Sequence, residues 1–173
     1  MTDKKHIHPN NGRIIDVEPV KTSAPDQAKE KLFNVEKVYV KKLSLEIPDA
    51  PESFLLKGEV KSDFEFKPEQ QKLSVEDTYE TTLNGTVKIK LGDKELAICN
   101  ILQSGIFKIK GFSEEEQKRL SFGYCPDVLY PYFRQTLANM LNEANLPPII
   151  LQPISFEMIY QQQLDKQKKE AAK

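Results

Sequence analysis

The stretch FGYCPDVLYPYFRQTLANML, Phe122–Leu141, constrains the fold more than any other part of the chain. Its apolar residues recur as adjacent pairs every four positions, which places them on one face of a helix. Pro126 suits the first turn of that helix, where a missing N–H costs nothing. Pro131 lies inside the pattern, so the first turn either kinks or ends there. The pattern predicts an amphipathic helix with an aromatic-rich buried face that ends near Asn145.

Alternating apolar and polar residues upstream of this helix predict four strands. The clearest is Tyr79–Leu91, which a tight turn at Gly92–Asp93 joins to Lys94–Lys110, so these two strands are expected to form a hairpin. Val35–Ile47 and Val60–Phe66 have the composition of two further strands. The first of these changes phase in its middle, at the lysine pair KK, which predicts a bulge or a local twist there.

The strand Lys94–Lys110 is apolar on both faces. An antiparallel strand of that kind usually has both faces covered. One chain of this size has few helices, so a partner subunit is one way to cover the second face. The alternative is a central strand with its own helix on one face and a loop on the other. The apolar residues of the two faces are Leu96, Ile98, Leu102 and Ile106, and Ala97, Cys99, Ile101, Phe107 and Ile109.

After the last predicted strand, the apolar residues no longer alternate with polar ones. Ser113 and Glu116 form the capping-box pattern S-x-x-E, which predicts a short helix through about Leu120. The prolines of LPPIILQP predict an extended crossover after the long helix, and Phe156–Leu164 predicts a final helical segment. Strands followed by helices indicate the α+β class, here a four-stranded antiparallel sheet followed by two to three helices.

The length of 173 residues fits one domain, expected at residues 33–163. Residues 1–32 are polar and without a sustained period, which predicts a disordered N-terminal arm. Its segment DQAKEKL has the composition of a short helix. The segment 164–173 has helix-forming residues but almost no apolar face, so we expect a terminal helix to fray into a flexible tail there.

Composition excludes several classes of function. A net charge of −1 gives no argument for nucleic-acid binding. No run approaches the roughly 18 apolar residues of a membrane span, so no membrane insertion is expected. The N-terminus has no apolar segment of the kind found in secretion signals, so a cytoplasmic location is predicted. The two cysteines, Cys99 and Cys125, are therefore expected to be buried and reduced.

No pattern in the chain indicates catalysis, so the chain is predicted not to be an enzyme and to need no cofactor or metal. Both histidines, His6 and His8, lie in the N-terminal arm, which leaves no histidine for a nucleophilic triad in the folded region. There is no phosphate-binding glycine motif. The acidic cluster Glu114–Glu116 begins a helix, where carboxylates stabilise the helix dipole.

Four blocks in order carry a resemblance to a known family. They are EIPDAP from Glu46, SGIFKIKG from Ser104, GYCPDVLYPYFRQ from Gly123, and LPPIILQPISFEMIYQQQ from Leu146. Together they resemble the SecB family of bacterial protein-export chaperones, from about Phe33 to Gln163. The resemblance implies a homotetramer, built as a dimer of dimers. It also implies an ATP-independent holdase that binds unfolded precursor proteins, keeps them competent for translocation and delivers them to SecA.

The resemblance also assigns roles to single residues. The groove that binds client proteins is expected to include Phe54, Phe64, Phe107, Tyr124 and Tyr132. The tetramer interface is expected to include Cys99, Ile101 and Gln103. The SecA-docking surface of the family is acidic and lies on the sheet. Here Glu46 matches it, whereas Lys42 and Asn100 stand where acidic residues are expected, which predicts weakened SecA binding.

Two other functions fit the same sequence. One is a specialised SecB-like chaperone that serves a toxin–antitoxin pair. The other is a scaffolding or interaction protein on the same fold without chaperone activity. Exposed apolar area distinguishes them, since a holdase needs grooves of many hundred Å² and a scaffold needs one defined patch.

Overall fold

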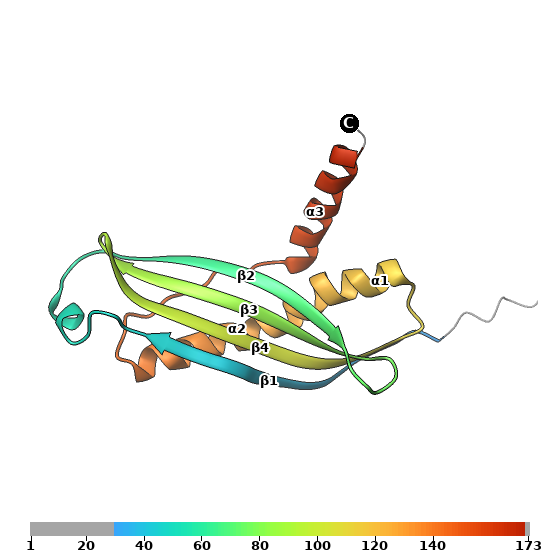
Figure 1. Ribbon diagram of the computed structural model, residues 1–173, viewed down its shortest axis with the longest axis horizontal. Helices are drawn as coiled ribbons and strands as arrows, with labels where there is room; N and C mark the ends of the chain where they lie inside the picture. Colours follow the sequence, from blue (N-terminus) through green and yellow to red (C-terminus); the bar gives the residue numbers. More distant parts are fainter. Residues whose placement is uncertain (1–29, 172–173) are drawn as a thin grey trace, which may run out of the picture.

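The computed structural model describes residues 30–171 (Figure 1). Almost all of the predicted N-terminal arm, with His6 and His8, lies outside the described residues. The first strand already begins at Leu32, so that residue belongs to the sheet and not to a short helix. The segment predicted as a tail is helical as far as Ala171.

Four antiparallel strands form a single sheet, as the sequence predicts. They are β1 (Leu32–Glu46), β2 (Val60–Lys72), β3 (Thr78–Leu91) and β4 (Lys94–Lys110). Their order is β1-β4-β3-β2, so β1 and β2 are the edge strands and β4 is central (Figure 1). A short 3₁₀ turn, η1 (Glu52–Leu55), lies in the connection between β1 and β2.

The details of the sheet confirm two sequence predictions. The β3–β4 hairpin closes at the pair Leu91 and Lys94, and Gly92 in the turn has a φ of 61°, which glycine adopts without strain. The pairing of β1 with β4 shifts register between Val40 and Lys42, at the predicted phase change. A second shift, between Val35 and Lys37, had no clear signal in the sequence.

The helices form one nearly continuous run followed by a separate helix. The run consists of α1 (Glu114–Arg119), the π-helical turn η2 (Leu120–Tyr124) and α2 (Cys125–Glu143), and α3 (Phe156–Ala171) follows an extended crossover. The capping box at the start of α1 is present as predicted. Pro131 does not end the helix, since α2 continues through it.

The core lies between α2 and one face of the sheet. Phe133 of α2 packs directly over Gly85 of β3, and any side chain at that glycine would collide with the phenyl ring. Phe107, Leu129 and Leu137 are fully or almost fully buried in the same layer. This close approach of helix to sheet follows from the paired apolar positions of the long helix and from small residues on the strands beneath it.

Both cysteines are free and buried, as expected. Burial raises the pKa of Cys99 to about 11 and that of Cys125 to about 12, so neither thiol is reactive near neutral pH. Within residues 30–171, no helix is both long enough and apolar enough to span a membrane.

Candidate functional site: an aromatic groove between β2 and α3

An open groove of about 470 Å³ lies between the edge strand β2 and α3. Its lining is mostly aromatic and aliphatic, with a few polar groups at the rim. The residues that line it are Phe64, Phe66, Lys67, Pro68, Phe122, Ile154, Phe156, Ile159, Tyr160 and Gln163.

An aromatic cluster forms the floor of this groove. The Phe66 ring lies 5.1 Å from that of Phe133, 5.5 Å from that of Tyr130 and 5.9 Å from that of Phe156, all edge to face. Such edge-to-face pairs fix the orientation of the rings and stabilise the cluster beyond the contribution of their buried apolar area. Because strand side chains alternate, Phe64 points to the same side as Phe66, but it lies further along the edge and is 48% exposed. The groove therefore has a rigid floor and an accessible aromatic rim.

The structure brings only one of the five predicted groove residues into this groove, namely Phe64. Tyr124 is about half exposed and lines a neighbouring pocket beside Leu120. Phe54 is on η1, and Tyr132 is on α2, and both are about half exposed away from the groove.

Phe107 requires a correction. It is fully buried under Phe33, with ring centroids 5.9 Å apart, because it points from β4 into the layer beneath the helices. It therefore supports the packing of this region and does not line a groove.

Sequence reasoning missed most of the lining, above all Phe122, Phe156, Ile159 and Tyr160. The signal that could have found them is the spacing of Phe156, Ile159 and Tyr160, which puts an apolar stripe on an otherwise polar terminal helix. What that stripe faces depends on where the crossover places α3, and no local pattern contains this information.

The residues predicted at the tetramer interface lie inside the single chain. Cys99 and Ile101 have no exposed surface and Gln103 has 2%, because α2 of the same chain covers them. The Gln103 amide donates to the backbone carbonyl of Tyr39, over 3.0 Å, and accepts from the Thr136 hydroxyl of α2, over 3.2 Å. Of the two ways to cover β4, the chain's own helix therefore accounts for this face.

The opposite face of the sheet carries no helix and is largely polar. Lys42 and Glu46 are exposed there, and Asn100 between them accepts a hydrogen bond of 2.9 Å from the Thr86 hydroxyl. The three residues predicted for SecA docking thus lie on one surface, since Lys42 pairs with Leu102, and Glu46 with Ile98, on either side of Asn100.

A buried carboxylate interrupts this polar face. Glu80, only 5% exposed, accepts hydrogen bonds from the Tyr39 hydroxyl and the Lys41 ammonium group, the latter at 2.8 Å. Burial alone would raise the pKa of Glu80, but the hydrogen bonds from Lys41 and Tyr39 outweigh it and hold that pKa below its usual value of 4.5. Burial, with the hydrogen bond to Glu80, raises the pKa of Tyr39 to about 12.

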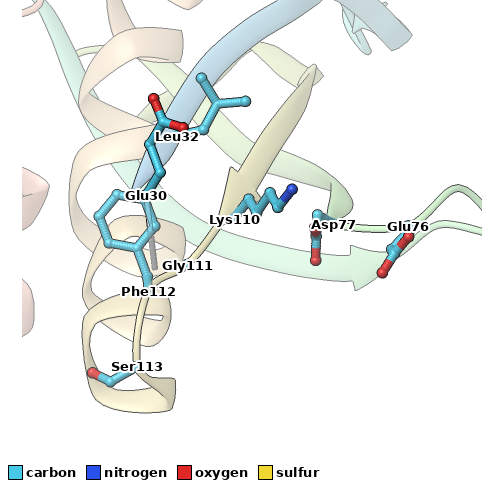
Figure 2. Close-up of a pocket in the computed structure, with 8 residues that line it drawn as sticks. All are labelled: Glu30, Leu32, Glu76, Asp77, Lys110, Gly111, Phe112 and Ser113. Carbon is cyan, nitrogen blue, oxygen red and sulfur yellow. The ribbon is translucent and has the colours of Figure 1, made fainter. Parts of the chain in front are cut away.

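A cavity of about 850 Å³ lies elsewhere, where the start of β1 meets the end of β4 (Figure 2). Figure 2 shows Glu30, Glu76, Asp77 and Lys110 around it, with Phe112 on one side. These groups have mixed charge, and no hydrogen-bonded arrangement aims them at a common point. Among the described residues there is no group of three or more histidine, cysteine, aspartate or glutamate side chains able to hold a metal ion.

Comparison with known proteins places the chain in a family. Residues 26–167 match the sequence profile described as "Preprotein translocase subunit SecB". The protein-export protein SecB of Methylococcus capsulatus is 38% identical over 149 residues, which cover 86% of this chain and 96% of the relative. That of Neisseria meningitidis is 40% identical over 133 residues, which cover 76% of this chain and 90% of the relative.

A solved structure has the same fold. It is a SecB-like chaperone of Mycobacterium tuberculosis in complex with a peptide from an antitoxin, with a TM-score of 0.61 and 17% identity, covering 71% of this chain and 91% of that one. At this identity the likeness concerns the fold alone. The profile match and the export-protein relatives confirm the resemblance seen in the sequence: the chain belongs to the SecB family.

Proposed function

We propose that this chain is an ATP-independent holdase of the cytoplasm, which binds unfolded precursor proteins and delivers them to SecA for export. The observation that carries the proposal is the aromatic groove between β2 and α3, with Phe64 48% and Ile159 40% exposed on opposite walls. The SecB relatives, which are named protein-export proteins, support the export role. Neither the proposed binding nor the proposed delivery requires a catalytic group.

Binding in the groove would use apolar contact and main-chain hydrogen bonds. An unfolded segment can place aromatic or aliphatic side chains between Phe64 and Ile159, with roughly 25 cal/mol gained per Å² of apolar surface buried. No described strand pairs with the outer edge of β2, so its backbone groups can pair with an extended chain. Neither contact reads a fixed sequence, so the proposed site accepts many clients.

Self-association into a tetramer would use a different surface from the one the sequence predicted. Leu43 of β1 is 49% exposed, and with Leu45 and Met140 of α2 it lines an open apolar groove of about 560 Å³. The outer edge of β1 lies beside it and has no pairing strand among residues 30–171. A second copy that covered this edge and groove would raise client affinity by presenting several grooves to one unfolded chain.

Delivery to SecA would use the helix-free sheet face, with lower affinity than in relatives that carry acidic residues there. Lys42 and Asn100 replace two acidic groups of the family surface, and Glu46 remains exposed. The toxin–antitoxin alternative has weaker support, because it rests on a likeness of fold, whereas the relatives at 38–40% identity are export proteins.

Light scattering tests the proposed function directly. An unfolded client is diluted into buffer with and without the full chain, in the absence of nucleotide, and again with ATP or with a chelator. We expect suppression of aggregation that neither addition changes. A chain that fails to suppress aggregation, or that requires ATP, contradicts the proposal.

A variant pair tests the groove itself. Phe64→Ser removes an exposed aromatic ring from the groove wall and should weaken client binding about three- to tenfold. Full burial of such a ring contributes about 1.5–3 kcal/mol, and a half-exposed site realises part of that. Val75→Ser is the matched control, because Val75 is 61% exposed in the loop between β2 and β3, outside the groove. Equal effects of the two substitutions would contradict the assignment of the groove.

A further inference from the structure

The helix α3 forms one wall of the groove, yet the side-chain contacts that attach its described part to the rest of the protein are concentrated between Phe156 and Tyr160. Figure 1 shows it standing away from the sheet. The Phe156 ring packs against Phe66 and Tyr130, and the Tyr160 ring stacks on Phe122, with centroids 6.3 Å apart. Beyond Tyr160, no hydrogen bond or ion pair joins the described part of α3 to another element, so the helix is held at one end.

A carboxylate from another helix fixes that end. Asp127, in the first turn of α2, accepts a hydrogen bond of 2.7 Å from the backbone N–H of Phe156 and one of 3.4 Å from that of Glu157. These N–H groups are among the four that the first turn of a helix leaves without a partner. The Ser155 hydroxyl accepts from the N–H of Met158. Asp127 thus caps α3 from outside, with a negative charge at the positive end of its dipole.

At the same point α3 and η2 approach each other closely. The Cα of Glu157 lies 3.0 Å from where a Cβ on Gly123 would be, so a side chain at Gly123 would force Glu157 to shift. The Glu157 carboxylate also forms an ion pair with Arg119 of α1. The base of α3 is therefore a narrow contact region in which Asp127 alone binds the helix backbone from α2.

We propose that Asp127 is the positioning residue of the groove. It holds the first turn of α3 and so sets the angle between that helix and the sheet. This angle determines the width of the groove, which is the distance from Ile159 or Gln163 on α3 to the β2 wall. The functional part of this inference rests on the proposed client binding. With a rise of 1.5 Å per residue, Gln163 lies about 10 Å along the helix from Phe156. A tilt of roughly 20° at the base would move Gln163 by ~3–4 Å, about the thickness of an aromatic ring.

The geometric half of the proposal can be measured without any client. Spin labels are placed across the groove in the full chain through Lys67→Cys and Gln163→Cys, and the native cysteines stay unlabelled because they are buried with raised pKa values. Asp127→Ala should broaden the distance distribution between the labels. Asp127→Asn should keep it narrow, because the amide oxygen can still accept the shorter hydrogen bond, that of 2.7 Å from the Phe156 N–H, although it cannot replace both carboxylate oxygens. Asp165→Ala, an exposed acidic residue further along α3, is the control and should change nothing.

The functional half compares two unfolded peptides, one rich in phenylalanine and tyrosine and one rich in valine and alanine. Asp127→Ala should change the ratio of their dissociation constants about three- to tenfold, whereas Asp127→Asn and Asp165→Ala should leave it within about twofold. A general loss of stability would weaken both peptides equally, so the ratio separates positioning from a purely structural role. Urea unfolding of each variant serves as a check that the body of the protein is intact.

Each outcome decides the inference. A narrow label distribution in Asp127→Ala overturns it, and so does a broad distribution with an unchanged affinity ratio. A broad label distribution in Asp127→Asn also overturns it, since the hydrogen bonds that the side chain accepts would then not be what positions α3. If the wild-type chain binds neither peptide, the proposed function fails, while the label distances still show whether Asp127 positions α3.

Discussion

On the central strand β4, Ile101 points under α2 and has no exposed surface, whereas its neighbour Leu102 points to the helix-free face and stays partly accessible. The two faces of the sheet also differ in composition. The covered face is apolar and close-packed, with Phe133 of α2 resting on Gly85 of β3. The open face is organised by hydrogen bonds, including Thr82 with Ser104 at 2.8 Å.

This difference separates what folds the chain from what is available to partners. Burial of apolar side chains beneath α2 supplies most of the driving force for folding. The open face contributes less to folding and tolerates charge, so the identity of its lysines and carboxylates can vary with the partner. Four predictions test how complete this separation is.

The largest effect is expected at the covered face. Ile101→Asp buries an unpaired carboxylate under α2 and should lower the free energy of unfolding by ~5 kcal/mol or more, while Leu102→Asp should lower it by about 1 kcal/mol. Urea unfolding of both variants measures the contrast. Equal losses would mean that the helix-free face is also covered, and loss of self-association in Leu102→Asp alone would place a subunit contact there.

Glu80 gives the next largest effect, because it is a buried group on the open face. Glu80→Gln should lower the free energy of unfolding by about 1–3 kcal/mol at neutral pH, since the charge that pairs with Lys41 is lost. The folded pKa of Glu80 lies below the usual 4.5, so its contribution is present above about that pH and is lost as the pH falls through the folded pKa. Urea unfolding from pH 7 to pH 3 should therefore show a smaller loss of stability in the variant than in the wild type.

A double substitution on the open face tests its proposed role in docking. Lys42→Asp with Asn100→Glu should strengthen binding of a basic SecA tail peptide by on the order of tenfold, because two favourable charge contacts of about 0.5–1 kcal/mol each are restored. Calorimetric titration at two salt concentrations measures it, and the gain should shrink at high salt. Client holding should not change. No gain at low salt would mean that docking uses other residues.

The smallest change in stability is expected for the hydrogen bond between Thr86 and Asn100 on the helix-free face. Thr86→Val removes the hydroxyl that donates to Asn100, at a cost of about 0.5–1 kcal/mol. Thermal unfolding against the wild type measures the difference. A loss of several kcal/mol would show that the hydrogen-bonded rows of this face are as important to folding as the covered core.

The sheet and the long helix could be predicted from the sequence because their signals are local. The alternation of Tyr79–Leu91, the glycine turn after it and the capping box at Ser113 each occupy a few consecutive residues. Continuation of α2 through Pro131 could not be predicted with the same certainty, since the burial of neighbouring residues such as Tyr130 and Phe133 outweighs the lost hydrogen bond.

The candidate site was predicted less well because it depends on contacts distant in sequence. Phe64 and Ile159 face each other only because the crossover carries α3 to the β2 edge. The same dependence on distant contacts applies to Ile101. Its strand is apolar on both faces, which favoured cover by a partner subunit over cover by the chain's own helix, yet α2 covers this residue. The order of the strands decides which neighbour covers a face, and a single strand pattern does not contain that order.

The irregularities of the two edge strands have a consequence for a protein that meets unfolded chains. Register shifts at Val35 to Lys37 and at Val40 to Lys42 interrupt the ladder of β1, and Pro68 removes a backbone donor from β2. A long, regular edge would let strand after strand stack in register, which is how cross-β fibrils grow. Broken edges allow one captured segment to pair briefly and then stop, so that the sheet does not become a template for the aggregation it is proposed to prevent.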